Sequence, residues 1–352
     1  MVAAIISFIL FYFFALSADW IRSEKLKNSL LILACIALAL IAGFRNPNGW
    51  SDTAGYTVAF QYYTNDIFNY SFSDRPFGYT EKGFYFLGVI VKSFSDNPTV
   101  YFIFISCITW FFLYKYFRKY CALPFIGLCV YIARFYSGRN MIQIRECLAI
   151  PIVLLASEHI VKREFWKFLI YVVIGYQFHR SALFAVPLYF LNWYHFKQKH
   201  IYWGILASFA IAVLWGGLIK NYVSNSDFFL NMARSYVQEE SDKAFGLGLA
   251  NPMIYYQTFL LLAFTYFEKR FKGFQDYYFL RTAYFYCTVV LIVLCDFAVL
   301  SARLSTIYAT IETLIIPSII LLFKKQERMF SALVILAVLL FFFYANFKNH
   351  IV

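Results

Sequence analysis

Charged residues are scarce in this sequence. Asp, Glu, Lys and Arg make up 14% of its 352 residues, whereas soluble domains carry roughly a quarter. Hydrophobic residues make up 62%, and the mean hydropathy is +0.63. This balance excludes an ordinary soluble domain. The net charge of +12 then indicates sorting of lysine and arginine across a membrane rather than binding of nucleic acid.

Three further features that the sequence lacks indicate which class of membrane protein this is. No segment shows the apolar–polar alternation of an outer-membrane barrel strand, so the membrane segments are predicted to be helices. None of the seven cysteines shows CxxC spacing, which argues against a metal site or a disulfide framework and favours packing. The first apolar run has no basic segment before it and no small-residue cleavage site, so we expect a retained helix.

Long apolar runs are what the sequence has instead. They predict an all-α, polytopic integral membrane protein with about twelve transmembrane helices in a single domain over residues 1–352. The runs lie at 2–19, 29–44, 98–116, 121–136, 143–161, 166–177, 181–193, 201–219, 253–267, 282–299, 304–323 and 329–346.

The segments between the runs fall into two classes, which predict the orientation. Six are short and rich in lysine: 21–29, 115–120, 161–167, 195–200, 267–274 and 323–330. All six lie on the cytoplasmic side if the 13-residue stretch 83–95 is re-entrant or interfacial instead of spanning. The other class then faces outward, as two large loops, 45–82 and 220–252, and three arginine-bearing connections, 134–145, 178–180 and 300–303.

Arginines concentrate on this predicted outer side, against the usual sorting bias. A guanidinium group binds phosphate in a bidentate manner and stays charged, so the group predicts a site for phosphate or pyrophosphate at the membrane surface. The alternative is that the arginines contact lipid headgroups or pair with nearby carboxylates. The candidates are Arg45, Arg134, Arg139, Arg145, Arg180 and Arg303.

Candidate acid–base groups lie in the same segments. Asp52 and Glu81 could accept hydrogen bonds from sugar hydroxyls, although Asp52 could also cap a short helix. His179 could act as a general base or have a structural role. No cluster of carboxylates suits a divalent cation, so we predict a metal-independent reaction without a cofactor. Asp296 could pair with Arg303 if one helix carries both.

Several short motifs resemble those of the EpsG family of membrane proteins, which includes Wzy-type O-antigen and capsule polymerases. The resemblance covers roughly residues 40–195, and one departure is the pair Trp50–Ser51, where a single residue is expected between the glycine and the aspartate. The matching residues are Arg45, Gly49, Asp52, Thr53 and Tyr56, then Glu81, Gly83 and Phe84, then Arg145 and Ala149, and finally His179, Ser181 and Ala182.

The resemblance implies a glycosyltransferase of the bacterial inner membrane whose active site faces the periplasm. Its substrates would be undecaprenyl-pyrophosphate-linked oligosaccharide repeat units, and a chain-length regulator and a flippase would be plausible partners. The arginines, with Tyr56, would bind pyrophosphate and sugar, and Asp52, Glu81 or His179 would remove a proton from the attacking hydroxyl. An O-antigen ligase, a flippase or other transporter, and a membrane acyltransferase are the alternatives, in that order of preference.

Overall fold

The computed structural model describes residues 2–46, 49–68, 81–225 and 247–350, and all of its regular secondary structure is helical. The central part of the predicted second outer loop, residues 226–246, lies outside the described residues, as does 69–80 in the first. The all-α, polytopic class is confirmed. Among the described residues, four helices are long and apolar enough to cross a membrane, or five if one bent pair forms a single span.

The chain divides into two compact units. Unit 1 comprises residues 1–158, 166–183 and 312–352, and unit 2 comprises 159–165 and 184–311. The helices of unit 1 are α1 (Val2–Asp19), α2 (Glu24–Gly43), α3 (Thr53–Tyr63), α4 (Lys82–Lys92), α5 (Pro98–Tyr120), α6 (Pro124–Tyr131), the π-helix η1 (Ile132–Ile142), α7 (Ile144–Leu155), α9 (Phe165–Tyr176), α17 (Glu312–Leu322) and α18 (Arg328–His350).

Helix α8 (Ser157–Val161) and the 3-10 helix η2 (Arg180–Ala185) each cross a boundary between the units, and the first residue of α9, Phe165, belongs to unit 2. The helices of unit 2 are α10 (Val186–Leu191), α11 (Gln198–Asn225), the 3-10 helix η3 (Gly248–Ala250), α13 (Pro252–Tyr266), α14 (Glu268–Phe271), α15 (Tyr277–Val293) and α16 (Ala298–Ala309).

Local signals explain where the long helices begin. Asn97 caps α5 by accepting a hydrogen bond from the Thr99 N–H at 2.9 Å, and Pro98 fills the first helical position. Asn251 and Pro252 start α13 in the same way. Ser23 caps α2, and the next residue is an acidic one that favours a helix N-terminus.

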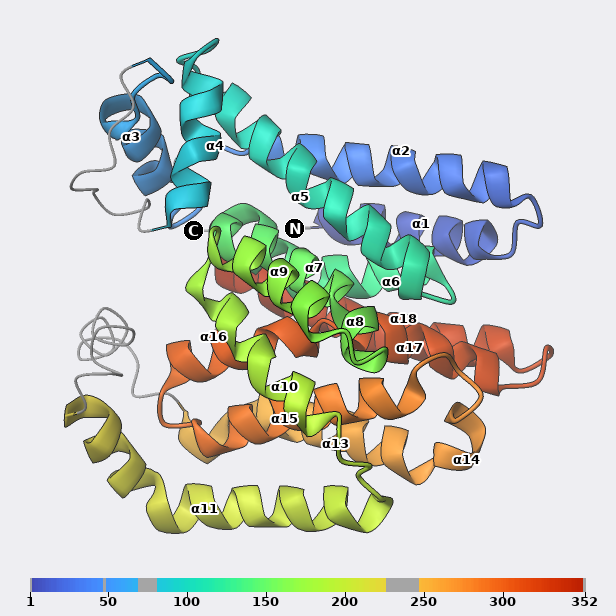
Figure 1. Ribbon diagram of the computed structural model, residues 1–352. Helices are drawn as coiled ribbons and strands as arrows, with labels where there is room; N and C mark the ends of the chain where they lie inside the picture. Colours follow the sequence, from blue (N-terminus) through green and yellow to red (C-terminus); the bar gives the residue numbers. More distant parts are fainter. Residues whose placement is uncertain (1, 47–48, 69–80, 226–246, 351–352) are drawn as a thin grey trace. The chain divides into compact units, whose positions relative to one another are not determined.

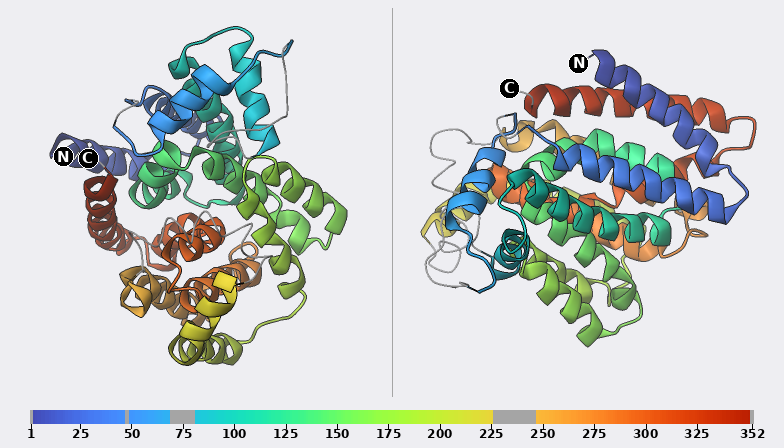
Figure 2. Two further views of the ribbon diagram at one scale, coloured as in Figure 1. Left: turned by 90° about the vertical axis from the view of Figure 1, so that its left-hand side faces the viewer. Right: turned by 90° about the horizontal axis from the view of Figure 1, so that it is seen from above.

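Within unit 1, α2 and α5 lie side by side, and α1 lies beside α18 (Figures 1 and 2). The rings of Phe8 and Phe343 stack at 4.6 Å between α1 and α18. Helix α4 packs on α5 through buried Phe84, Val89 and Val91. Its 11 residues span about 16 Å, roughly half the hydrocarbon thickness, so α4 by itself is too short to cross.

Two of the predicted connections are helical instead. Most of segment 134–145, expected as an outer connection, belongs to η1 and the start of α7, and Arg139 and Asn140 in it are only 3% exposed. Segment 300–303 lies inside α16, while the break falls before it, between Val293 and Ala298. The structure differs from both predictions because an arginine need not mark a helix end, since its charge can be paired inside a bundle.

Candidate active site

Three residues far apart in the sequence meet around one guanidinium group in unit 1. Arg145, in the first turn of α7, donates from Nη1 to Glu81 Oε2 at 2.6 Å and from Nε to Tyr56 Oη at 3.2 Å. The Glu81 side chain is 5% exposed and that of Arg145 is 16% exposed. Glu81 directly precedes α4, and Tyr56 lies on α3. The first predicted outer loop and the predicted arginine motif therefore form one polar cluster.

Asp52 and Tyr56 extend this cluster toward the start of α3. Burial raises the pKa of the Tyr56 phenol, and the neighbouring Arg145 opposes that rise without cancelling it. Asp52 precedes α3 and is half-buried. Its side chain makes no capping hydrogen bond to the first turn of the described helix, and instead accepts a 3.3 Å hydrogen bond from Ser51 Oγ. The capping interpretation of Asp52 is therefore not supported.

Gly83 allows the segment that carries Glu81 to lie close to the segment that carries His179. A Cβ atom at Gly83 would lie 2.6 Å from Gln177 Cβ and 2.8 Å from the Gln177 carbonyl oxygen. This close approach lets the Phe84 N–H donate to that oxygen at 3.1 Å. Residues 81–84 are therefore attached to the backbone two residues before His179. Gln177 was not singled out from the sequence, because its contribution is a main-chain carbonyl that any residue could supply.

His179 is buried, and its ring has a defined hydrogen-bond pattern. The Ser181 N–H donates to Nδ1 at 3.3 Å, and Ser181 Oγ lies 2.7 Å from the same nitrogen. A ring nitrogen that accepts from a backbone N–H carries no proton, so neutral His179 holds its proton on Nε2. In that form the imidazole can donate a hydrogen bond from Nε2. This pattern favours a donor role for His179 over a role as general base.

Arg45 and Thr53 both bind the end of the π-helix. Arg45 donates to the carbonyl oxygens of Ala42 at 2.7 Å and Met141 at 2.9 Å, and the Thr53 hydroxyl donates to the same Met141 oxygen at 3.3 Å. The guanidinium group of Arg45 also lies over the Phe102 ring, 4.7 Å from its centroid. Arg45 is 5% exposed. These contacts give Arg45 a structural role, since they attach α2 and α3 to η1 beside Arg145.

The two arginines of η1 have internal neighbours as well. Arg134 pairs with Glu312 at 2.9 Å, and the side chains are 8% and 0% exposed. The Arg139 guanidinium lies over the Phe135 ring, 3.9 Å from its centroid, and it interacts electrostatically with Glu146. The alternative that some arginines pair with local carboxylates therefore applies to Arg134. Glu312, an acidic residue within the apolar run 304–323, thereby has a structural partner.

The two remaining arginines have different positions. Arg180, the first residue of η2, is exposed next to His179. Arg303 is half-buried on α16 and belongs to unit 2, whereas the cluster around Arg145 belongs to unit 1. Asp296 lies between α15 and α16, so no single helix carries both Asp296 and Arg303, as their predicted pairing required.

The arrangement combines a half-buried carboxylate, a phenol, a carboxylate–guanidinium pair and an imidazole donor on neighbouring segments. Such a set can accept and donate hydrogen bonds to a polyhydroxylated ligand and can stabilise negative charge on a leaving group. The contacts on which it depends join residues 64 and 89 positions apart in the sequence.

Comparison with known proteins identifies the family of the chain. The chain is 24% identical over 325 residues to the amylovoran biosynthesis protein AmsC of Erwinia amylovora, which covers 88% of this chain and 84% of that protein. No solved structure matches the chain. The sequence profile of the EpsG family matches residues 28–351, which include every residue of the cluster. The chain belongs to the EpsG family.

Proposed function

We propose that this protein is a membrane glycosyltransferase that polymerises undecaprenyl-pyrophosphate-linked oligosaccharide units on the outer face of the bacterial inner membrane. Family membership and the similarity to a protein of amylovoran biosynthesis support a role in polysaccharide biosynthesis. The candidate spans support an integral membrane location. Polymerisation is the specific activity that the cluster around Arg145 supports best.

The observation that carries the proposal is the contact of Arg145 with both Glu81 and Tyr56, next to Asp52. Of the three predicted bases, Asp52 is the best placed. Glu81 is engaged by the guanidinium group of Arg145, and the Nδ1 atom of His179 accepts a hydrogen bond from the chain. Asp52 is half-buried and bonded to one neighbouring hydroxyl, so its carboxylate can accept a substrate proton.

The reaction exchanges one C–O bond for another. A hydroxyl of the acceptor sugar attacks the anomeric carbon of the donor while Asp52 takes its proton. The new glycosidic bond forms, and the bond from the anomeric carbon to the pyrophosphate oxygen breaks. The electron pair leaves with undecaprenyl pyrophosphate, whose negative charge the guanidinium groups of Arg145 and exposed Arg180 stabilise.

The other predicted arginines take different parts in this proposal. Arg45, Arg134 and Arg139 hold the π-helix and its neighbours in place behind Arg145. Arg303 remains a predicted pyrophosphate ligand on unit 2. His179 donates from Nε2 to a substrate oxygen in this scheme.

A deletion strain tests the activity, with its surface polysaccharide resolved by size on a gel. A ladder that collapses to a single repeat unit on the acceptor is the result expected of a polymerase. Lipid-linked polymer that accumulates outside, with no sugar on the acceptor, would instead identify a ligase. Single units held in the cytoplasmic leaflet would identify a flippase. Purified protein that still polymerises lipid-linked units in a chelator would support the predicted independence of metal ions.

A further inference from the structure

Unit 2 contains a pocket that the proposed glycosyltransferase reaction does not use. Its volume is about 370 Å³. It lies among the segment that precedes α9, the segment between α10 and α11, and the connection from α14 into α15. These are three of the segments that the lysine distribution predicts to be cytoplasmic.

The lining of this pocket is cationic and aromatic. Arg163, Lys272 and Arg281 contribute three positive charges to the lining and Asp276 contributes one carboxylate, while Glu268 pairs with Arg281 from outside the lining. Among the aromatic lining residues, Trp193 is 57% exposed and Tyr194 is 53% exposed. The Arg163 guanidinium lies 5.7 Å from the centroid of the Trp193 ring.

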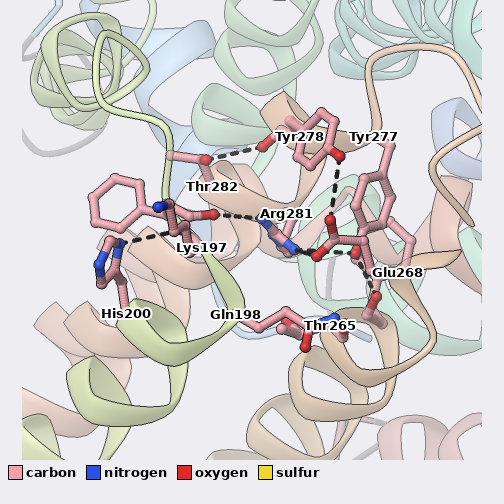
Figure 3. Close-up of polar contacts among 11 residues, drawn as sticks. Lys197, Gln198, His200, Thr265, Glu268, Tyr277, Tyr278, Arg281 and Thr282 are labelled. Atoms are coloured by element: carbon pink, nitrogen blue, oxygen red, sulfur yellow. Dashed lines mark hydrogen bonds and ion pairs between the residues drawn. The ribbon is translucent and has the colours of Figure 1, made fainter.

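Arg281 is 1% exposed, and buried contacts hold it in place (Figure 3). Nη1 donates to Glu268 Oε2 at 2.7 Å, and Nη2 donates to the Phe196 carbonyl oxygen. The buried Nε–H has no hydrogen-bond partner in the described part of the chain. A buried donor without a partner costs free energy. Because the Nε atom is inaccessible, Arg281 acts on a bound anion through its positive charge rather than through this N–H.

The backbone around the pocket is unusual as well. Arg163 has φ +61° and Asp276 has φ +58°, and they are the non-glycine residues with positive φ in the described ranges. Left-handed backbone is uncommon outside glycine, asparagine and aspartate, and it is strained for other residues. At Arg163 this conformation belongs to one of the pocket's own cations.

We propose that this pocket binds the phosphate group of an anionic phospholipid in the cytoplasmic leaflet. Basic pockets at the cytoplasmic ends of membrane helices suit anionic headgroups, and exposed tryptophan and tyrosine prefer the depth of those headgroups. Arg163 and Lys272 contact the phosphate from the rim, and Arg281 adds positive charge to the lining beneath them. The site is independent of the glycosyltransferase reaction.

The test uses the full chain purified in a neutral detergent, with retained lipid measured by native mass spectrometry. We expect phosphatidylglycerol or cardiolipin to be retained in preference to phosphatidylcholine. In the variant Arg163→Asn with Lys272→Gln, we expect retention to fall roughly tenfold or more, since each cation near the surface contributes about 1 kcal/mol. Asparagine is chosen because it tolerates the left-handed backbone at position 163.

The matched control is Lys199→Gln with Lys269→Gln. These substitutions remove two exposed charges close to the same segments, from residues outside the pocket lining. The control is expected to retain lipid like the original protein. Equal retention by the pocket variant, or no preference for anionic lipid in the unaltered protein, would overturn the proposal. Binding of inorganic phosphate that depends on Arg163 and Lys272, without any retained lipid, would overturn the assignment to a lipid.

Discussion

At the scale of single residues, the predicted arginines divide by what they contact. Arg45 binds main-chain carbonyls and Arg134 binds a buried carboxylate, which are structural contacts. Arg145 instead joins two side chains from the motif segments around α3 and α4. All of these arginines are predicted to lie at the outer membrane surface, so the sequence does not distinguish them. Their hydrogen-bond and ion-pair partners in the structure separate a structural arginine from a candidate for the active site.

The first prediction separates stability from activity at Arg145. Arg145→Ala leaves the Glu81 carboxylate, 5% exposed, without its guanidinium partner, so we expect a loss of up to about 3 kcal/mol in stability together with loss of polymer. Adding Glu81→Gln to Arg145→Met removes the uncompensated charge. This double variant should recover most of the stability and still make no polymer, as measured by thermal unfolding in detergent and by the gel ladder. A ladder of normal length from it would remove Arg145 from the mechanism.

The second prediction concerns the two residues that precede α3 and α5. Asp52→Asn should change stability by less than about 0.5 kcal/mol, because Asp52 makes no capping hydrogen bond in the described structure, and should abolish polymer. Asn97→Ala should have the opposite effect. It removes the cap of α5 and should cost about 1 kcal/mol while the ladder persists. Polymer of normal length from Asp52→Asn would show that another group takes the proton.

At the scale of elements, the site depends on short helices held close to longer ones. In the first turn of α4, the Phe84 N–H donates to the Gln177 carbonyl oxygen. The π-helix η1 follows α6 directly and is separated from α7 by one residue, Gln143. π-helices of this kind are rare and occur frequently at functional sites. In this chain the π-helix carries Arg134 and Arg139 and ends at Met141, whose carbonyl oxygen accepts hydrogen bonds from Arg45 and Thr53.

The third prediction tests the contact between α4 and Gln177. Gly83→Ala would place a Cβ 2.6 Å from Gln177 Cβ, so α4 must move away from the segment that carries His179. We expect a cost of roughly 1–3 kcal/mol and shortened or absent polymer. Gly273→Ala is the control, because nothing lies within 4 Å of the added atom. Equal ladders from both variants would show that this close approach does not matter for activity.

At the scale of the whole molecule, the orientation in the membrane is still a prediction from the lysine distribution. It requires that the chain before and after α4 lie on the same side of the membrane. This agrees with the length of α4, because 11 helical residues are too few to cross. The segment between α4 and α5 then faces outward together with Asp52 and Glu81. The pocket of unit 2 faces the cytoplasm under the same assignment.

The fourth prediction tests this orientation. In a Cys107→Ala background, where the six remaining cysteines are buried, Ser95→Cys should react with a membrane-impermeant thiol reagent added from outside. Lys325→Cys, in the lysine segment before α18, should react only after the membrane is opened. The reverse pattern would mean that the region around α4 crosses the membrane, and the predicted sides of the later segments would exchange.

The amino-acid sequence is enough to predict the class of protein and the candidate site residues. Long apolar runs leave few structures other than membrane helices, because the backbone must satisfy its own hydrogen bonds in lipid. The motifs in the sequence are sufficient to predict Asp52, Tyr56, Glu81 and Arg145 as candidate site residues. The helix breaks were less predictable, since an apolar run does not show whether α6 continues as a π-helix or where α16 begins.

Packing between distant segments sets which of these residues contact one another. The Arg145–Glu81 pair joins positions 64 apart, and the contact of Gly83 with Gln177 depends on a main-chain carbonyl. Sequence spacing predicts contacts within one helix, but not contacts between helices that pack from distant parts of the chain. The same limit applied to Arg134, whose partner Glu312 lies 178 residues away. Packing therefore gives Arg45 and Arg134 their structural contacts and brings Arg145 to two side chains of the motif segments.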